Sequence, residues 1–163
     1  MERAITISRE FGSGGRELGV KLAESLGIPF YDKELISMAA EESDMSEDAF
    51  LHYDENMPFI KDPLDRHFYS PFSSIYQVPM SDQIFLAQSR VIRKLADQGP
   101  CVIVGRCADM VLENSVNLFI YARMKDRIKR MNSLETGVDP VKMESRIREV
   151  DRKRKDYYQY YTG

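Results

Sequence analysis

Short apolar runs of the kind that form buried strands alternate along the chain with segments of helical periodicity. Residues 3–8 form the first run, and apolar side chains then recur with a 3.6-residue period between Arg16 and Leu26. Gly27 is suited to end this helix, and residues 28–31 predict a second short strand. This order of strand, glycine-rich turn, helix and strand predicts a parallel α/β sheet.

Two more strands are expected in the second half of the chain, the first of them fully buried. A helix capped by Ser81 or Asp82 ends at Gly99 and is followed by an apolar run at 101–104. Another apolar run lies at 116–121. The remaining sequence predicts two charged helices, at 124–134 and 140–158.

The segment between these two halves differs in character. Residues 33–60 predict acidic helices, whereas residues 57–80 contain four prolines, which exclude a long regular element there. We therefore expect a mobile insertion at about 33–82 within a single domain that spans 1–163. The core of that domain is expected at about 1–32 and 83–122, and a helical region follows at about 123–163.

Composition supports one folded domain and excludes several classes of function. The 163 residues are 43% hydrophobic and 30% charged, which is typical of a globular chain. With 23 Lys and Arg against 26 Asp and Glu, the net charge of −3 disfavours non-specific nucleic-acid binding. No apolar run approaches the roughly 20 residues of a membrane span, and no signal peptide is evident. Cys101 and Cys107 do not suggest a disulfide framework, so we expect a cytoplasmic protein.

The first candidate for chemistry is a glycine-rich turn between a strand and a helix. It consists of Gly12, Ser13, Gly14, Gly15 and Arg16. Such a turn presents backbone N–H groups to a phosphate, and the helix N-terminus adds a favourable potential. A tight turn that needs positive φ is the structural alternative, but three glycines in four residues exceed that need. The pattern therefore predicts phosphate binding.

This turn departs from the P-loop pattern G-x-x-x-x-G-K-[ST]. When Gly14 is aligned with the second glycine, Arg9 stands at the first glycine, Gly15 at the lysine and Arg16 at the Ser/Thr position. Arg16 is expected to take the cationic role, because a guanidinium binds phosphate bidentately. Ser13 or a water molecule would then serve the metal.

Two further polar residues follow predicted strands. Arg106 comes after the run at 101–104, and Asp32 comes after the strand at 28–31. Ligands of open α/β sheets bind beyond the carboxyl ends of the strands, so Arg106 is suited to an anionic substrate; a surface salt bridge is the alternative. Asp32 is suited to general-base catalysis or to Mg²⁺, and equally to capping the helix that follows.

A basic run near the C-terminus admits three interpretations. The pattern at residues 146–155 is consistent with a solvated helix face and with a lid that closes over phosphates. It is also consistent with a nucleic-acid patch on which tyrosines would stack bases. The interspersed Glu149 and Asp151 weaken the nucleic-acid interpretation. No cluster of His, Cys or acids has metal-ligand spacing, so we expect Mg²⁺ to arrive with a nucleotide.

Four segments taken together resemble the cytidylate kinase-like family of the P-loop nucleoside monophosphate kinases. They are ISREFGSGGRELGVKLAESLGIPFYDKELI, CVIVGRCADMVL, NLFIYARMKDRIKRM and IREVDRKRKDYYQYYTG. The resemblance covers nearly the whole chain. It implies a three-layer α/β fold with helices on both faces of a P-loop NTPase-like parallel sheet, a helical NMP-binding insertion and a helical lid. It also implies a final strand, and so a native chain that continues beyond Gly163.

The resemblance assigns roles to individual residues. Arg106 matches the arginine that binds the substrate phosphate, while Cys107 replaces the aspartate that follows it and Asp109 lies near enough to substitute. Asp32 matches an aspartate at the edge of the monophosphate pocket, and Asp151 matches an acid on the cytosine side. The lid arginines, which would contact phosphate groups, are Arg127, Arg130, Arg152 and Arg154.

The reaction implied is phosphoryl transfer from ATP, with Mg²⁺, to a nucleoside monophosphate, with CMP or dCMP as the acceptor. The catalytic set would be Arg16, Asp32, Arg106, Arg152 and Arg154, since this chemistry needs positioning and charge neutralisation. The expected partners are small nucleotides, not nucleic acids or membranes. Two alternatives stay open: a nucleotide-binding module without kinase activity, because the P-loop lysine is missing, and a small-molecule kinase with another acceptor.

Overall fold

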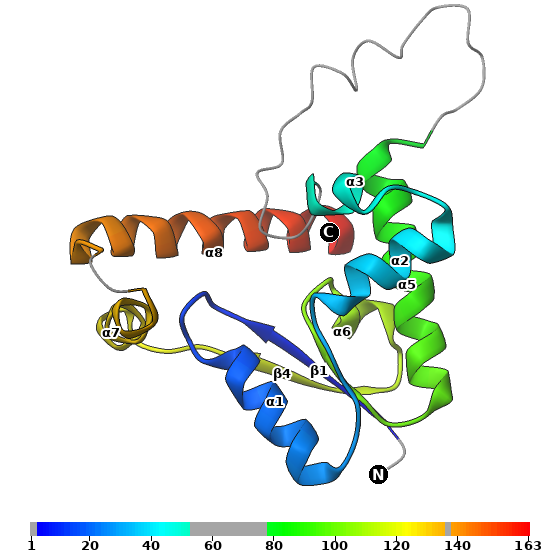
Figure 1. The fold of residues 1–163 in the computed structure, drawn as a ribbon, viewed down its shortest axis with the longest axis horizontal. Helices are drawn as coiled ribbons and strands as arrows, with labels where there is room; N and C mark the ends of the chain where they lie inside the picture. Colours follow the sequence, from blue (N-terminus) through cyan, green and yellow to red (C-terminus); the bar gives the residue numbers. More distant parts are fainter. Residues whose placement is uncertain (1–2, 53–77, 136–137) are drawn as a thin grey trace, which may run out of the picture.

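A four-stranded sheet lies at the centre of the computed structural model, which describes residues 3–52, 78–135 and 138–163 (Figure 1). All neighbouring strands run parallel, in the order β2-β3-β1-β4. The parallel α/β sheet expected from the sequence is therefore confirmed. The four strands are β1 (Ala4–Arg9), β2 (Phe30–Tyr31), β3 (Val102–Val104) and β4 (Ser115–Ile120).

The helices agree with the sequence pattern to within a few residues, with two differences. Positive φ at Asp44 breaks the acidic segment after residue 33 into two helices, and a one-turn helix follows β3 where none was expected. Most of the proline-rich part of the predicted insertion lies outside the described residues. The helices are α1 (Gly15–Leu26), α2 (Glu34–Ser43), α3 (Glu47–His52), α5 (Met80–Gln98), α6 (Ala108–Val111), α7 (Met124–Leu134) and α8 (Pro140–Thr162).

Helices cover both faces of the sheet, so the fold has three layers. Val102 and Val104 of β3 face α1, where they pack with Ala23. Ile103, between them, points to the other face and packs with residues of α2, α5 and α6, such as Leu35. This alternation follows from the period of two along a strand and explains why β3 is apolar throughout.

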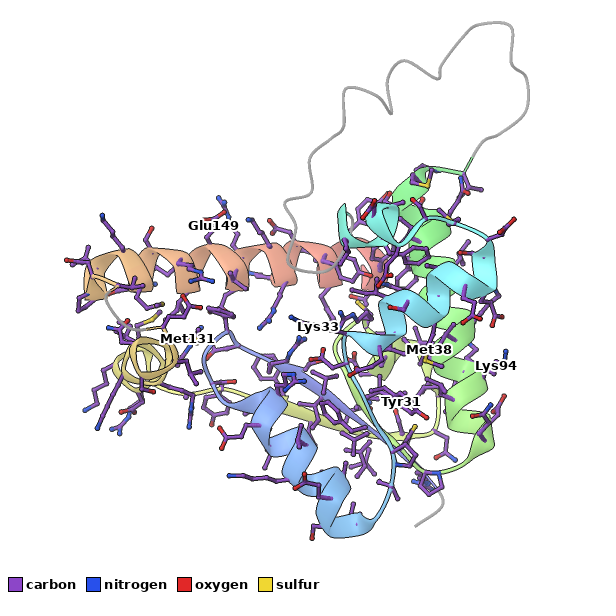
Figure 2. The ribbon with its side chains drawn as sticks, viewed as in Figure 1. Tyr31, Lys33, Met38, Lys94, Met131 and Glu149 are labelled. Atoms are coloured by element: carbon purple, nitrogen blue, oxygen red, sulfur yellow. The ribbon has the colours of Figure 1, made fainter. Side chains whose placement is uncertain are left out.

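The helix α8 crosses the edge of the sheet where the strands end (Figure 1). Asp139 caps its first turn, accepting hydrogen bonds from two backbone N–H groups. Figure 2 shows Met131 of α7 on the side that faces α8, and Glu149 on the outer side of α8. At the far end, the ring of Tyr161 stacks on Phe85 of α5 at 3.9 Å. The terminal tyrosines therefore pack α8 onto the core.

Two features bear on the environment of the chain. Cys101 and Cys107 are both buried, and neither takes part in a disulfide. Within the described ranges, no helix is both long and apolar enough to cross a bilayer.

Close packing of α1 on the sheet depends on Gly19. A Cβ atom at this position would lie 2.9 Å from Cε2 of Phe30 and 3.1 Å from Cδ1 of Ile7. Gly19→Val should therefore lower the free energy of unfolding by about 1–3 kcal/mol, the usual cost of overpacking a core. Denaturant unfolding measures this, with Ser25→Ala on the exposed side of α1 as the control. Equal stability of the two variants would contradict the packing.

Candidate functional site

The glycine-rich turn joins the end of β1 to the start of α1. Gly12 and Gly14 have φ of 76° and 88°, in the left-handed region that favours glycine. Gly14 is also the N-cap of α1, so the first N–H groups of that helix open toward this turn. The positive φ values that the structural alternative requires are thus present. They are also the geometry that creates a phosphate-type loop.

Ser13 lies inside this turn with an unsatisfied hydroxyl. Its side chain is buried, and Oγ has no hydrogen-bond partner in the described part of the chain. A buried hydroxyl without a partner is costly, and a phosphate oxygen or a metal ion would satisfy it. The residue therefore fits a ligand of either kind.

Asp32 brings together two arginines that lie far apart in the sequence. Its Oδ2 accepts a hydrogen bond from Nε of Arg16 at 2.9 Å, and its Oδ1 accepts one from Nη1 of Arg106 at 2.8 Å. The side chains of Asp32 and Arg106 are only 5% and 2% exposed, whereas Arg16 is 59% exposed. The salt bridge expected as the alternative for Arg106 is therefore present, but it is buried at the edge of the sheet.

The backbone after β3 aims Arg106 inward. Gly105, Arg106 and Cys107 have φ of 77°, 55° and 53°, three successive residues in the left-handed region. For the two that are not glycine this conformation costs roughly 1–2 kcal/mol each, and such strain is concentrated at functional sites. The turn directs the guanidinium of Arg106 toward Asp32 instead of toward solvent.

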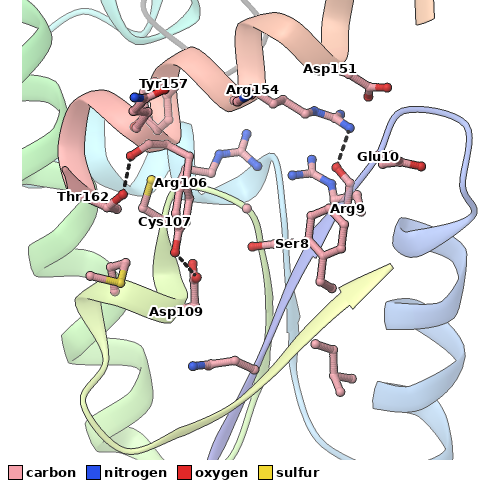
Figure 3. Close-up of a pocket in the computed structure, with 18 of the residues that line it drawn as sticks. Ser8, Arg9, Glu10, Arg106, Cys107, Asp109, Asp151, Arg154, Tyr157 and Thr162 are labelled. Carbon is pink, nitrogen blue, oxygen red and sulfur yellow. Dashed lines mark hydrogen bonds between the residues drawn. The ribbon is translucent and has the colours of Figure 1, made fainter. Parts of the chain in front are cut away.

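A cavity of about 1110 Å³ lies between the ends of β1 and β4 and the C-terminal half of α8 (Figure 3). Among the predicted site residues, it is lined by Arg106, Asp109, Asp151 and Arg154. Cys107, which stands where the family resemblance has an aspartate, is buried and also lines the cavity. The structure thus brings together residues from β1, from the turn after β3 and from α8.

Asp109 forms a hydrogen bond with Tyr158, which no motif in the sequence singles out. Its Oδ2 accepts a hydrogen bond from the Tyr158 hydroxyl at 2.8 Å. Burial, and then the Asp109 carboxylate, raise the pKa of Tyr158 to about 12, so the tyrosine stays protonated and donates. No spacing signal predicts this pair, because its members come from α6 and α8.

Arg127 anchors α7 to the turn and to α8. Its side chain is 4% exposed and donates to the Glu10 carboxylate at 3.0 Å, to the Phe11 carbonyl at 2.8 Å and to Asp151. Asp151 in turn accepts a hydrogen bond from the Phe11 backbone N–H at 2.7 Å. The phosphate role of Arg127 and the base-side role of Asp151 stay predictions, but both residues already organise the loop.

The other three arginines that are predicted to contact phosphates from α7 and α8 divide into two groups. The guanidinium of Arg130 lies directly over Gly14, and its Nη1 donates to the Gly12 carbonyl at 3.3 Å. Arg154 donates to the Arg9 carbonyl at 3.2 Å and lies over the Phe11 ring. Arg152 is exposed, and no hydrogen bond links it to the residues described above. Arg130 and Arg154 therefore approach the loop, whereas Arg152 does not.

A metal ion has few protein ligands here. No group of three or more His, Cys, Asp or Glu is close enough to hold a metal among the residues that the structure describes. Both carboxylate oxygens of Asp32 face guanidinium groups, which compete with a cation. Ser13 is the better of the two predicted contacts for Mg²⁺.

Residues 4–163 match the model of the cytidylate kinase-like family. Among solved structures, an uncharacterized protein from Eubacterium ventriosum ATCC 27560 is 30% identical, with a TM-score of 0.68. The match covers 98% of this chain and 78% of that one. A comparison with curated proteins gives no match.

Two kinases share the fold at low sequence identity. A gluconokinase from Sinorhizobium meliloti 1021 has a TM-score of 0.53 at 12% identity, covering 98% of this chain and 93% of its own. A shikimate kinase from Bacteroides thetaiotaomicron has a TM-score of 0.54 at 15% identity, covering 98% and 83%. At these identities the likeness establishes the α/β fold of P-loop kinases and nothing more specific.

Removing the buried anchor of α7 should destabilise the protein. Arg127→Met leaves the Glu10 and Asp151 carboxylates without their shared cation, which should cost about 3 kcal/mol of unfolding free energy. Arg123→Met is the matched control, because Arg123 is 75% exposed and its pair with Asp126 should contribute at most about 1 kcal/mol. Urea unfolding of both variants measures the difference. Similar stabilities would show that Arg127 is not an anchor.

Proposed function

Because the chain belongs to the cytidylate kinase-like family, we propose that it transfers the γ-phosphoryl group of ATP to the phosphate of CMP or dCMP. The bond between the γ-phosphorus and the β–γ bridging oxygen breaks. A bond to an oxygen of the acceptor phosphate forms, and the products are ADP and the nucleoside diphosphate. Family membership supports a nucleotide-dependent phosphotransferase, and the choice of acceptor is the finer part of the proposal.

The observation that carries the proposal is the pair of arginines on one carboxylate. Arg16 lies in the first turn of α1, after the phosphate-type turn, Arg106 lines the cavity, and both donate to Asp32. The donor side and the acceptor side of a transfer site would meet at this point. Converging guanidinium groups suit phosphoryl transfer, since its catalysis rests on positioning and on neutralising the transferring group.

On the donor side, the turn would bind the ATP phosphates. The open N–H groups of α1, the Ser13 hydroxyl and the Arg130 guanidinium all lie at this turn. Mg²⁺, when bound with ATP, supplies further charge neutralisation. Ser13 would hold it, directly or through water.

On the acceptor side, the cavity would take the monophosphate. Arg106 would hold its phosphate, and the carboxylates of Asp109 and Asp151 would lie nearer the base. A carboxylate accepts a hydrogen bond from the amino group of cytosine, which uracil lacks. This chemistry favours CMP and dCMP over UMP.

Closure over the two nucleotides would complete the site. We assign residues 123–163 as a lid and about 33–82 as the monophosphate-binding insertion, around a core of 1–32 and 83–122. Arg152 and Arg154 would reach the transferring group from the lid, and exclusion of water would limit ATP hydrolysis.

One observation favours a second acceptor class. Asp32 is a buried carboxylate next to Arg106, a placement that suits a general base for a hydroxyl group. A gluconokinase and a shikimate kinase share the fold, so a small hydroxyl compound is the alternative acceptor.

Replacing Arg16 should abolish most of the activity. An arginine on the transferring phosphate contributes about 10³–10⁵ in rate, so Arg16→Ala should lower kcat/KM at least 100-fold while the protein stays folded. An ADP-release assay with Mg²⁺ and ATP measures this, with CMP, dCMP, UMP, AMP, GMP, gluconate and shikimate as acceptors in turn. Arg148→Ala on α8 is the control, because Arg148 is exposed and pairs with Glu144.

Each outcome of this assay decides between the functions. Full activity of Arg16→Ala would remove that residue from the site. Transfer to gluconate or shikimate and to no nucleotide would favour the second acceptor class. Tight ATP binding without ADP release for any acceptor would favour a nucleotide-binding module.

A further inference from the structure

The exchange of residues within the P-loop pattern has a steric counterpart in the structure. Arg9 stands where the pattern has its first glycine, and Gly15 stands where it has the lysine. Arg9 is the last residue of β1 and Gly15 is the first residue of α1, so the two lie on opposite sides of the turn.

Steric contact links these two departures from the pattern. A Cβ atom on Gly15 would lie 2.6 Å from Cβ of Arg9 and 3.1 Å from its Cγ. The first separation is shorter than side chains tolerate, so no residue larger than glycine fits at 15 while an arginine occupies 9. The φ of Gly15 is not in the left-handed region, so steric contact and not backbone conformation requires this glycine.

The same distance shows where the Arg9 side chain starts. Its Cβ lies only 2.6 Å from the point at which the side chain of a lysine at residue 15 would begin. A guanidinium reaches about as far from Cβ as a lysine ammonium does, and it binds phosphate bidentately. We propose that Arg9 takes the part of the missing P-loop lysine and binds the transferring phosphoryl group, an inference that rests on the proposed function.

The surroundings of Arg9 fit this role. Arg9 lines the cavity with Arg106, and Figure 3 shows the two guanidinium groups extending toward one another below α8. An anion between them would contact a cation from the donor side and another from the acceptor side. Arg154 donates to the Arg9 carbonyl at 3.2 Å, which fixes the backbone at the point where the side chain departs.

A four-variant cycle tests both the steric and the catalytic part. Arg9→Met should lower kcat/KM for ATP at least 100-fold and weaken ATP affinity, whereas Arg9→Lys should retain a measurable part of both. Gly15→Lys should be inactive and should melt below the wild-type protein. Arg9→Gly combined with Gly15→Lys restores the order of the P-loop pattern, so it should melt at a higher temperature than Gly15→Lys and should be more active than Gly15→Lys. Arg148→Met is the control for loss of an exposed arginine.

The outcomes separate this inference from the proposed function. A wild-type protein that transfers phosphate while Arg9→Met keeps at least half of its kcat/KM overturns the role of Arg9 and leaves the proposed function standing. ATP binding without transfer overturns the proposed function, and the affinities of Arg9→Met and Arg9→Lys then decide the role of Arg9. A Gly15→Lys variant as stable as the wild type overturns the steric argument. Absence of ATP binding by the wild-type protein overturns both.

Discussion

A buried carboxylate shared by two arginines is the constraint on which the site depends. Asp32 and Arg106 are nearly inaccessible to water, so each charge is tolerated only because the other is present. Their pairing requires the end of β2 to lie beside the end of β3, and the strand order places them so. Arg16 adds a second guanidinium to the same carboxylate. The cluster therefore carries a net positive charge, which a phosphate would neutralise.

The cluster around Arg127 has a net negative charge, and it holds helices in place instead of offering charge to a ligand. One guanidinium serves two carboxylates, Glu10 and Asp151, and all three of its nitrogens are engaged. Such a group holds the turn, α7 and α8 in one arrangement. Closure of a lid in this protein would therefore either keep the cluster intact or break a buried ion pair, and the first is far less costly.

The sequence predicts the fold well where the spacing of apolar residues determines whether a segment forms a helix or a strand. The strands, α1, α5, α7 and α8 follow from runs and 3.6-residue spacing, because each buries an apolar face against the sheet or a neighbouring helix. The start of α6 escapes such analysis, since it follows left-handed residues at Arg106 and Cys107 that no propensity favours. The break at Asp44 escapes it for the same reason.

The site is less predictable than the fold, because its contacts join distant elements. Motif position identified Asp32 and Arg106 separately, yet their contact spans 74 residues and depends on which strands are neighbours. The pair of Asp109 and Tyr158 depends on where α8 crosses the sheet. The contact between residues 9 and 15 is indicated in the sequence, because both residues depart from the same P-loop motif. Only the distance between the two positions in the structure shows that the two departures are sterically linked.

The charge distribution argues for a small anionic ligand and against a nucleic acid. The whole chain carries a net charge of −3, with an acidic segment that includes Glu34, Glu47 and Asp48 on α2 and α3. Binding along a nucleic-acid backbone needs positive charge spread over a surface. Here the guanidinium groups converge on one turn and one cavity, and several are held by carboxylates. A site of this kind would suit a few phosphate groups at fixed positions, as the proposed transfer between two bound nucleotides requires.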